Sequence, residues 1–254
     1  MTIIGIIPAR MAASRFPGKP LAPLCGRPMI EHVYRRAARA VCLDRVYIAT
    51  PDREIYEAAG CFGAPAIMTS PAHTRATDRV AEAAQGLPAD VVVNIQGDEP
   101  MIDPAALDLL GEAMTADATL ACANLVNRIT LDEDFRNPNQ IKVVCDRMAN
   151  VLYMSRQPIP SSTPGAEGWL RQLGIIAFRR DFLTTFASLP STPLECAESI
   201  DMLRAIEHGF KVRAVVSHHE SFGVDTVDDM ELAEARLAGD PLVADLFGPC
   251  AGGS

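Results

Sequence analysis

Aromatic residues are scarce in this sequence, and so is any excess of positive charge. Only 6% of the 254 residues are aromatic whereas 48% are hydrophobic, so the core must be built mainly from Ala, Val, Leu and Ile. The 32 acidic residues outnumber the 23 basic ones, which gives a net charge of −9. We therefore expect neither nucleic acid nor an anionic membrane as a partner. An anionic small substrate is still compatible with this composition, because the charge of a site is local.

Cysteine motifs, membrane-length apolar runs and a secretion signal are also missing. The seven cysteines are odd in number, form no C-x-x-C pair and lie partly in apolar runs such as 143–145. This usage is typical of reduced core thiols and argues against a zinc site. No apolar run approaches the ~20 residues of a membrane helix. The N-terminus lacks the charged and apolar segments of a signal peptide, so we expect a cytoplasmic protein.

The two common glycine-rich nucleotide motifs are absent as well. Neither G-x-x-x-x-G-K-[ST] nor G-x-G-x-x-G after a strand occurs, which argues against a P-loop ATPase and an NAD enzyme. Instead, an apolar β-type run over 3–7 leads into a loop, 8–20, that carries Arg10, Arg15 and Lys19. Loop N–H groups and these cations suit a nucleoside triphosphate at the end of the first strand. The alternative is a solvated basic loop without function.

Apolar β-type runs alternate with helical patterns in the first half of the chain. This alternation predicts an α/β fold with a mostly parallel central sheet and helices on both faces. Thr77 is a candidate N-cap for a helix over 77–85, and one continuous helix is expected over 194–209. The second half is less regular, with a long Pro/Gly-rich loop through 158–168, which we expect to form an insertion.

Two aspartates stand where a metal site would be expected. Asp98 follows a buried apolar run over 91–95, and polar groups after such a strand lie at the crevice where α/β sheets bind ligands. Asp225 precedes a helix that Thr226 could cap. Together the two carboxylates could bind Mg²⁺, which prefers one or two carboxylates plus phosphate oxygens. Each aspartate could instead serve only as a helix cap.

These segments together resemble the CMP-Kdo synthetases, the 3-deoxy-manno-octulosonate (Kdo) cytidylyltransferases. The matching segments keep their order and rough spacing over nearly the whole chain: Ile7–Leu21, Gly26–Ile30, Thr77–Arg79, Asn94–Pro100, Asn137–Asn139, Lys142–Val144, Ser155–Pro160, Leu194–Glu195 and Gly223–Thr226. The resemblance implies a Rossmann-like nucleotidyltransferase fold, in which CMP passes from CTP to an acid with release of pyrophosphate. It also implies a homodimer. The chain would be one domain over 1–254, with a CTP-binding half to about residue 125 and an acceptor-binding and dimerisation half from about residue 126.

The resemblance also implies a role for individual residues. CTP would be bound by Arg10, Ser14, Arg15, Lys19, Thr77, Arg79 and Gln96. Lys19, Arg10 and Asp98 would be catalytic, and Asp98 and Asp225 would bind Mg²⁺. The acceptor would meet Arg75, Gln96, Lys142, Arg156, Gln172, Ile176, Glu195 and Cys196. In-line phosphoryl transfer needs mainly positioning and charge neutralisation, which these side chains supply.

Several acceptor positions depart from the family pattern. Arg75 and Ala76 replace Ser-Gly, Gln172 and Ile176 replace the His and Tyr of His-x-Gly-Ile-Tyr, and Cys196 replaces the Gln of Leu-Glu-Gln. Lost hydroxyl-recognising groups and a gained arginine favour a smaller, more anionic acceptor than Kdo. We expect phosphonoformate, in phosphonate natural-product biosynthesis, as the best single acceptor. The alternatives are Kdo itself with drift at these positions, a sugar-1-phosphate uridylyl- or guanylyltransferase, and an inactive nucleotide-binding regulatory protein.

Overall fold

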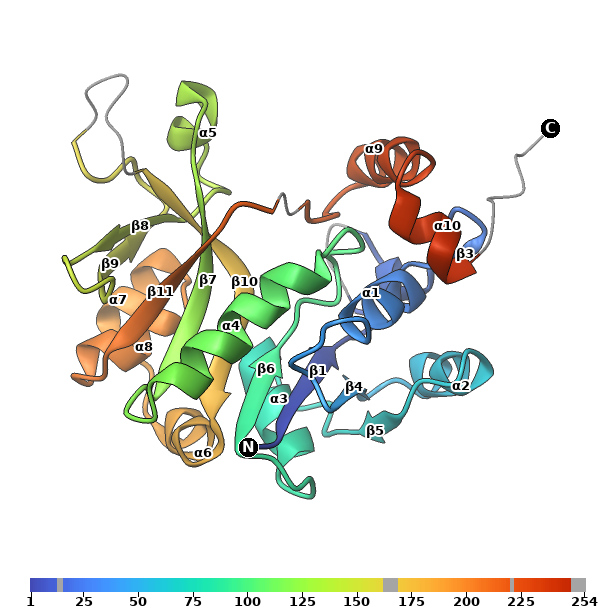
Figure 1. The fold of residues 1–254 in the computed structure, drawn as a ribbon, viewed down its shortest axis with the longest axis horizontal. Helices are drawn as coiled ribbons and strands as arrows, with labels where there is room; N and C mark the ends of the chain where they lie inside the picture. The colour runs from blue at the N-terminus through green and yellow to red at the C-terminus, as the bar shows by residue number, and fades with distance from the viewer. Residues whose placement is uncertain (13–15, 162–168, 220–221, 248–254) are drawn as a thin grey trace.

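A mixed β-sheet forms the centre of the molecule (Figure 1). The computed structural model describes residues 1–12, 16–161, 169–219 and 222–247. Within these residues the strands are β1 (Ile3–Pro8), β2 (Pro23–Leu24), β3 (Arg27–Pro28), β4 (Arg45–Thr50), β5 (Ala66–Met68), β6 (Val91–Asn94), β7 (Cys122–Arg128), β8 (Lys142–Cys145), β9 (Val151–Ser155), β10 (Leu170–Arg179) and β11 (Val212–Ser217). The large sheet has the order β11-β7-β10-β6-β1-β4-β5, with β8 beside β10 and β9 beside β8, while β2 and β3 form a separate pair.

In the large sheet, the neighbouring strands β6, β1, β4 and β5 of the first half are parallel, as expected from their apolar runs. β1 lies between β4 and β6 and is parallel to both, and all six of its residues are buried. Strands covered on both faces need continuous apolar runs, which is why β1 and β6 could be located in the sequence. β10, from the second half, enters antiparallel between β6 and β7 and sets Ile176 opposite Asn94. The predicted α/β fold with a mostly parallel central sheet is confirmed.

Helices cover both faces of the sheet. The helices are α1 (Met29–Ala37), α2 (Arg53–Cys61), α3 (Ala76–Ala84), α4 (Pro104–Ala116), α5 (Asp132–Arg136), α6 (Arg180–Ser188), α7 (Pro193–Glu198), α8 (Met202–Glu207), α9 (Val227–Leu237) and α10 (Pro241–Phe247), with a short 3-10 turn, η1, over Lys19–Leu21. The buried residues of α1, α2 and α4 pack in one apolar cluster with one face of the sheet, and those of α3, α6 and α8 pack in a second cluster with the other face. Apolar burial on both sides is the main stabilising contribution to such a layered fold.

The C-terminal helices return to the N-terminal part of the chain. Figure 1 shows α9 and α10, in red, beside the blue α1, and their apolar residues share a cluster with Leu24 and Met29. α9 begins with a capping box in which the Asp229 amide donates to Thr226 Oγ1 (3.2 Å) and the Thr226 amide donates to Asp229 Oδ2 (2.9 Å). The predicted cap at Thr226 is confirmed. This return brings the segment before α9 to the ends of β1 and β6.

Two local predictions were wrong. The helix expected over 194–209 is broken into α7 and α8, because Ser199 takes a left-handed conformation (φ 55°) that ends α7. Thr77 does not cap α3: the helix begins at Ala76, and Thr77 Oγ1 donates to Asp201 Oδ2 (3.2 Å) instead. A left-handed Ser gives no glycine-like signal in the sequence, so the break between α7 and α8 could not be located there.

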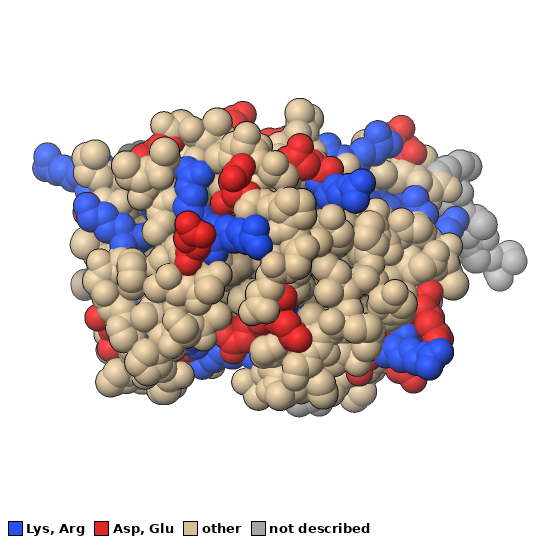
Figure 2. Space-filling model, turned by 90° about the horizontal axis from the view of Figure 1, so that it is seen from below, with Lys and Arg blue, Asp and Glu red and all other residues tan. Residues whose placement is uncertain are grey.

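The surface carries both signs of charge. On the face shown in Figure 2, basic and acidic side chains lie next to one another within a larger uncharged surface. No helix in the described ranges combines the length and the apolar composition needed to cross a bilayer.

Candidate active site

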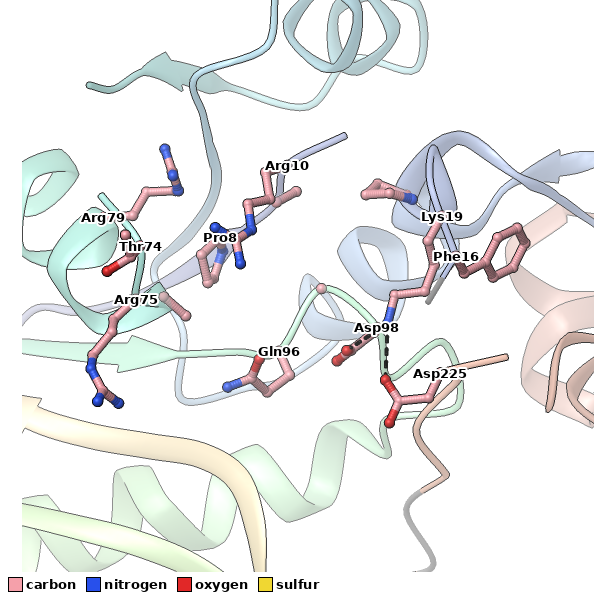
Figure 3. Close-up of a pocket in the computed structure, with 14 residues that line it drawn as sticks. Pro8, Arg10, Phe16, Lys19, Thr74, Arg75, Arg79, Gln96, Asp98 and Asp225 are labelled. Carbon is pink, nitrogen blue, oxygen red and sulfur yellow. Dashed lines mark hydrogen bonds and ion pairs between the residues drawn. The ribbon is translucent and has the colours of Figure 1, made fainter. Parts of the chain in front are cut away.

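A pocket opens at the carboxyl ends of β1 and β6, the edge of the sheet at which α/β proteins bind ligands (Figure 3). Its lining comes from three stretches of the first half and from the segment before α9. The lining residues are Pro8, Ala9, Arg10, Phe16, Lys19, Pro20, Thr74, Arg75, Ala76, Arg79, Gln96, Gly97, Asp98 and Asp225. Of the residues predicted to bind CTP, Arg10, Lys19, Arg79 and Gln96 line this pocket, whereas Ser14 and Arg15 lie outside the described residues.

Lys19 is the centre of one end of the pocket. Gly18 takes a left-handed conformation (φ 75°) at the start of η1, and Lys19 follows with only 9% of its surface exposed. Its ammonium donates to Asp98 Oδ2 at 2.8 Å, to the Val224 carbonyl at 2.6 Å and to Asp225 Oδ1 at 3.4 Å. A lysine from the first loop thus joins two carboxylates that are far apart in the sequence (Figure 3).

The backbone explains how the two aspartates meet. Gly97 turns the chain after β6 so closely over β1 that a Cβ atom on it would lie 2.8 Å from the Pro8 carbonyl oxygen. The Val224 amide then donates to the Asp98 carbonyl (2.9 Å), which ties the segment before α9 to the end of β6. Asp225 is held further by its own amide, which donates to Asp229 Oδ2 (3.0 Å).

The donor set fits a hard divalent cation that also contacts the substrate. The described part of the chain contains no cluster of three or more His, Cys, Asp or Glu side chains suited to a metal. Two carboxylates, Asp98 and Asp225, do share one cation, the Lys19 ammonium. Mg²⁺ takes one or two protein carboxylates and completes its shell with water and phosphate oxygens, so these residues are compatible with it.

A second charged cluster flanks the other end of the pocket. Arg75 is ion-paired with Asp201 and, at 3.3 Å, with Glu195. Glu195 is fully buried and accepts from Arg204 at 2.6 and 2.8 Å, a bidentate pair. Burial alone would raise the pKa of Glu195, but the hydrogen bonds and charge of Arg204, with the charge of Arg75, hold that pKa below its usual value. The positive charge of Arg75 is therefore already balanced by two carboxylates.

Arg79 forms part of the pocket wall. Its guanidinium is buried and donates to Thr69 Oγ1 (2.7 Å) and to the carbonyls of Ser70 (3.2 Å) and His73 (3.1 Å). Burial, together with the charge of Arg10, lowers the pKa of Arg79. Its observed contacts thus order the loop before α3. Thr77, also predicted to lie near CTP, is 2% exposed and is not among the lining residues.

Lys142 and Arg156 lie apart from the pocket lining. Lys142 is fully buried, and its ammonium donates to the carbonyls of Asn137 (2.8 Å), Gln140 (2.5 Å) and Arg156 (2.6 Å). Burial lowers the pKa of this lysine. Arg156 in turn donates through Nε to the Glu198 carbonyl (2.8 Å). In this structure Lys142 joins β8 to the residue that follows β9, and Arg156 joins that segment to the end of α7.

The remaining predicted acceptor residues differ in their surroundings. Gln172 Nε2 donates to Asn124 Oδ1 at 2.6 Å, Ile176 is buried in the sheet, and Cys196 is exposed on α7. Sequence reasoning missed Asn124, which is fully buried on β7 and binds the backbone of β10. A polar residue inside the apolar stretch 120–126 was the available signal.

Comparison with known proteins agrees with this geometry. The solved structure described as CMP:2-keto-3-deoxy-manno-octonic acid synthetase complexed with CTP superposes with a TM-score of 0.89 at 38% identity, covering 94% of this chain and 99% of that one. The fold and pocket therefore define a nucleotidyltransferase. The cytidylyltransferase family model matches residues 4–216. The chain belongs to the cytidylyltransferase family and is an enzyme of that class.

Curated relatives cover nearly the whole chain. The 3-deoxy-manno-octulosonate cytidylyltransferase of Syntrophobacter fumaroxidans is 46% identical over 96% of this chain and 100% of its own length. The protein of the same name from Geobacter metallireducens is 42% identical over 94% of this chain and 98% of its own length. The resemblance to the CMP-Kdo synthetase family seen in the sequence is confirmed.

These relatives correct the expected acceptor. The prediction of phosphonoformate, and with it a place in phosphonate biosynthesis, was wrong, since full-length relatives at this identity are named as Kdo enzymes. The structure supplies a physical reason. A strongly anionic acceptor would need the positive charge of Arg75, and that guanidinium is already paired with Asp201 and Glu195.

Proposed function

We propose that this protein transfers CMP from CTP to Kdo and releases pyrophosphate. The observation that carries the proposal is near-complete coverage by relatives named as Kdo cytidylyltransferases, at 46% identity for the Syntrophobacter fumaroxidans protein. The joined Lys19, Asp98 and Asp225 support it, because charge neutralisation and positioning are what phosphoryl transfer requires.

The triphosphate of CTP would lie over the loop after β1. Arg10 and Lys19, with Ser14 and Arg15 of the same loop, would bind its oxygens, and Gln96 would meet the nucleotide and the acceptor from the end of β6. An acceptor hydroxyl would attack the α-phosphorus in line through its oxygen and lose its proton to solvent. The bond from that phosphorus to the bridging oxygen would break, and pyrophosphate would leave with the bond electrons. Lys19 would stabilise the charge that develops on pyrophosphate.

Mg²⁺ belongs to the same proposal. Asp98 and Asp225 would hold it, and it would neutralise phosphate charge when bound. In this structure the Lys19 ammonium pairs with both carboxylates. Mg²⁺ on these carboxylates would take the place of the ammonium, and Lys19 would then be free to turn toward the phosphates.

The acceptor side would be built from the far end of the pocket. Arg75 and Gln96 line it, and Gln172, Ile176, Glu195 and Cys196 would shape or support it from β10 and α7. Lys142 and Arg156 would support this side through the backbone they hold. Glu195 would act through Arg75, because Glu195 itself is fully buried.

The proposal extends to a cytoplasmic homodimer joined through the second half of the chain. Met148 and Leu152 support it, because both are large apolar residues exposed at the β8–β9 hairpin (69% and 57%). Light scattering on the purified protein tests the dimer: a mass of twice 27.3 kDa supports it, and a monomer at micromolar concentration contradicts it.

Pyrophosphate release tests the reaction itself. The protein, with Mg²⁺ and CTP, is assayed with Kdo, with phosphonoformate and without acceptor, and the Kdo assay is repeated with UTP, GTP and ATP. Release that requires both CTP and Kdo supports the proposal. Release with another nucleotide only, or CTP binding without release, contradicts it.

A further inference from the structure

Gly174 lies directly beneath Gln96. Ile176 pairs with Asn94 and Ala177 with Val93 across β10 and β6, so the same antiparallel register places Gly174 opposite Gln96. A Cβ atom on Gly174 would lie 2.3 Å from Cγ of Gln96, 3.0 Å from Cδ and 3.1 Å from Nε2. The side chain of Gln96 thus occupies the volume that any other residue at position 174 would fill.

The backbone around Gly174 is irregular and specifically held. The pairing of β10 with β7 shifts register between Gln172 and Ile176, so the intervening residues form a bulge. Asn124, fully buried on β7, donates through Nδ2 to the carbonyls of Leu173 (2.8 Å) and Ile175 (3.1 Å). It thereby satisfies carbonyls on both sides of Gly174 and fixes the bulge in place.

A Cβ atom added at Gly174 would clash with the side chain of Gln96. Gly174 is not among the described glycines with positive φ, so an alanine there meets no backbone strain. The three nearest atoms all belong to Gln96 beyond its Cβ, and the closest, Cγ, is near the backbone. A methyl group would therefore force Gln96 to change its χ1 rotamer, which moves the whole carboxamide.

We propose that Gly174, on the bulge that Asn124 holds, is a positioning residue that fixes the Gln96 carboxamide in the pocket and so sets the enzyme's affinity for its acceptor. This inference rests on the proposed function for the identity of that acceptor and for its contact with Gln96. Gln96 lies between the Arg75 end and the Lys19 end of the pocket, where an acceptor must meet the nucleotide (Figure 3). A displacement of about 1 Å in such a group can cost on the order of 10²-fold in rate.

A double-mutant cycle tests the proposal. Gly174→Ala, Gln96→Ala and the double variant are compared with the wild type for kcat and for KM toward Kdo. We expect Gly174→Ala to raise KM for Kdo by about tenfold or more in the presence of Gln96 and by less than about twofold in the Gln96→Ala background. An equal loss in both backgrounds, or no loss in either, would overturn the proposal, because the glycine would then not act through Gln96.

Gly60→Ala is the matched control. Gly60 is exposed on α2, and a Cβ atom there would meet nothing within 4 Å, so the same substitution should leave both kinetic constants unchanged. If Gly174→Ala fails to fold, the double variant tests whether Gly174 acts through Gln96. A double variant that folds with the activity of Gln96→Ala supports the proposal, and one that also fails to fold contradicts it.

A crystal structure of Gly174→Ala separates this inference from the proposed function. If the wild type does not use Kdo, the proposed acceptor is wrong, but the crystal structure of Gly174→Ala still tests whether Gly174 positions Gln96. A displaced Gln96 over an unmoved β10 supports it. An unmoved Gln96 over a shifted β10 overturns it.

Discussion

The ammonium of Lys19 lies 2.8 Å from Oδ2 of Asp98, so the loop after β1 and the turn after β6 are joined by an ion pair inside the pocket. Asp225 approaches the same ammonium at 3.4 Å from the segment before α9. Only 11% of the lysine side chain is exposed, whereas the side chains of Asp98 and Asp225 are 35% and 46% exposed, so solvent still reaches both carboxylates. Three parts of the chain thus contribute to one charged centre.

Removing the ammonium tests this centre first. Lys19→Met keeps the aliphatic stem and removes the charge, so we expect kcat to fall by about 10²–10³-fold while CTP binding weakens less. Steady-state kinetics and calorimetric CTP titration measure the two effects. Arg53→Met, at a side chain that is 86% exposed, is the control and should leave kcat unchanged. A Lys19→Met enzyme with normal kcat would remove Lys19 from the catalytic step.

Neutralising either aspartate should weaken the response of the enzyme to Mg²⁺. Asp98→Asn and Asp225→Asn preserve shape, and we expect each to lower kcat by at least about 10²-fold and to raise the Mg²⁺ concentration needed for half-maximal rate. Chelation of divalent cations should stop the wild-type reaction reversibly. Asp228→Asn, at an exposed position on α9, is the matched control. Normal Mg²⁺ dependence in both active-site variants would exclude the proposed metal ligands.

The buried Glu195–Arg204 pair should contribute strongly to stability. Glu195→Ala leaves the buried Arg204 without its bidentate partner, and we expect a loss of about 3–5 kcal/mol in the free energy of unfolding. Urea unfolding followed by circular dichroism measures it. Glu57→Ala removes an exposed pair with Arg53 and should have a much smaller effect.

The same carboxylate predicts a pH dependence. The folded pKa of Glu195 lies below its usual value of 4.5, so the charge contributes stability that is fully present above that pH and is lost as the pH falls through the folded pKa. The stability difference between wild type and Glu195→Gln should therefore shrink on acidification below about pH 4.5. A difference that stays constant would show that the ionised form is not favoured by folding.

The described cysteines should differ in reactivity by their burial. Desolvation raises the pKa of Cys122 to about 12, and desolvation together with Asp108 raises that of Cys42 to about 12. Only thiolates react readily with alkylating agents, so iodoacetamide should label the exposed Cys61 and Cys196 well before these two. Mass spectrometry of timed samples measures the order. Early labelling of Cys42 or Cys122 would contradict the packing around them.

The sequence predicted the elements that are marked by a pattern of neighbouring residues, such as an apolar run. The buried strands β1 and β6 were visible as apolar runs, and the loop after β1 and the turn at Asp98 followed from them. The antiparallel entry of β10, the end of α7 at Ser199 and the bulge held by Asn124 depend on contacts between distant segments. Such contacts leave no periodic pattern in the sequence.

In the candidate site, the sequence could not predict the partners of Arg75 and Lys142. Lys142 was expected to meet a substrate because it is cationic and lies in a matching segment, and Arg75 because it adds a cation where the family pattern has none. The structure balances Arg75 with Asp201 and Glu195, and it surrounds the Lys142 ammonium with three backbone carbonyls. A residue type determines which interactions a side chain can make, whereas tertiary packing determines which partner it meets.

The most direct test of the account is the product formed from CTP and Kdo. Purified protein is incubated with Mg²⁺, CTP and Kdo, and the mixture is analysed by mass spectrometry for CMP-Kdo alongside pyrophosphate. The account predicts CMP-Kdo and pyrophosphate in equal amounts, with no conjugate from the Lys19→Met variant. A wild-type enzyme that forms no CMP-Kdo but conjugates CMP to another acid would contradict it.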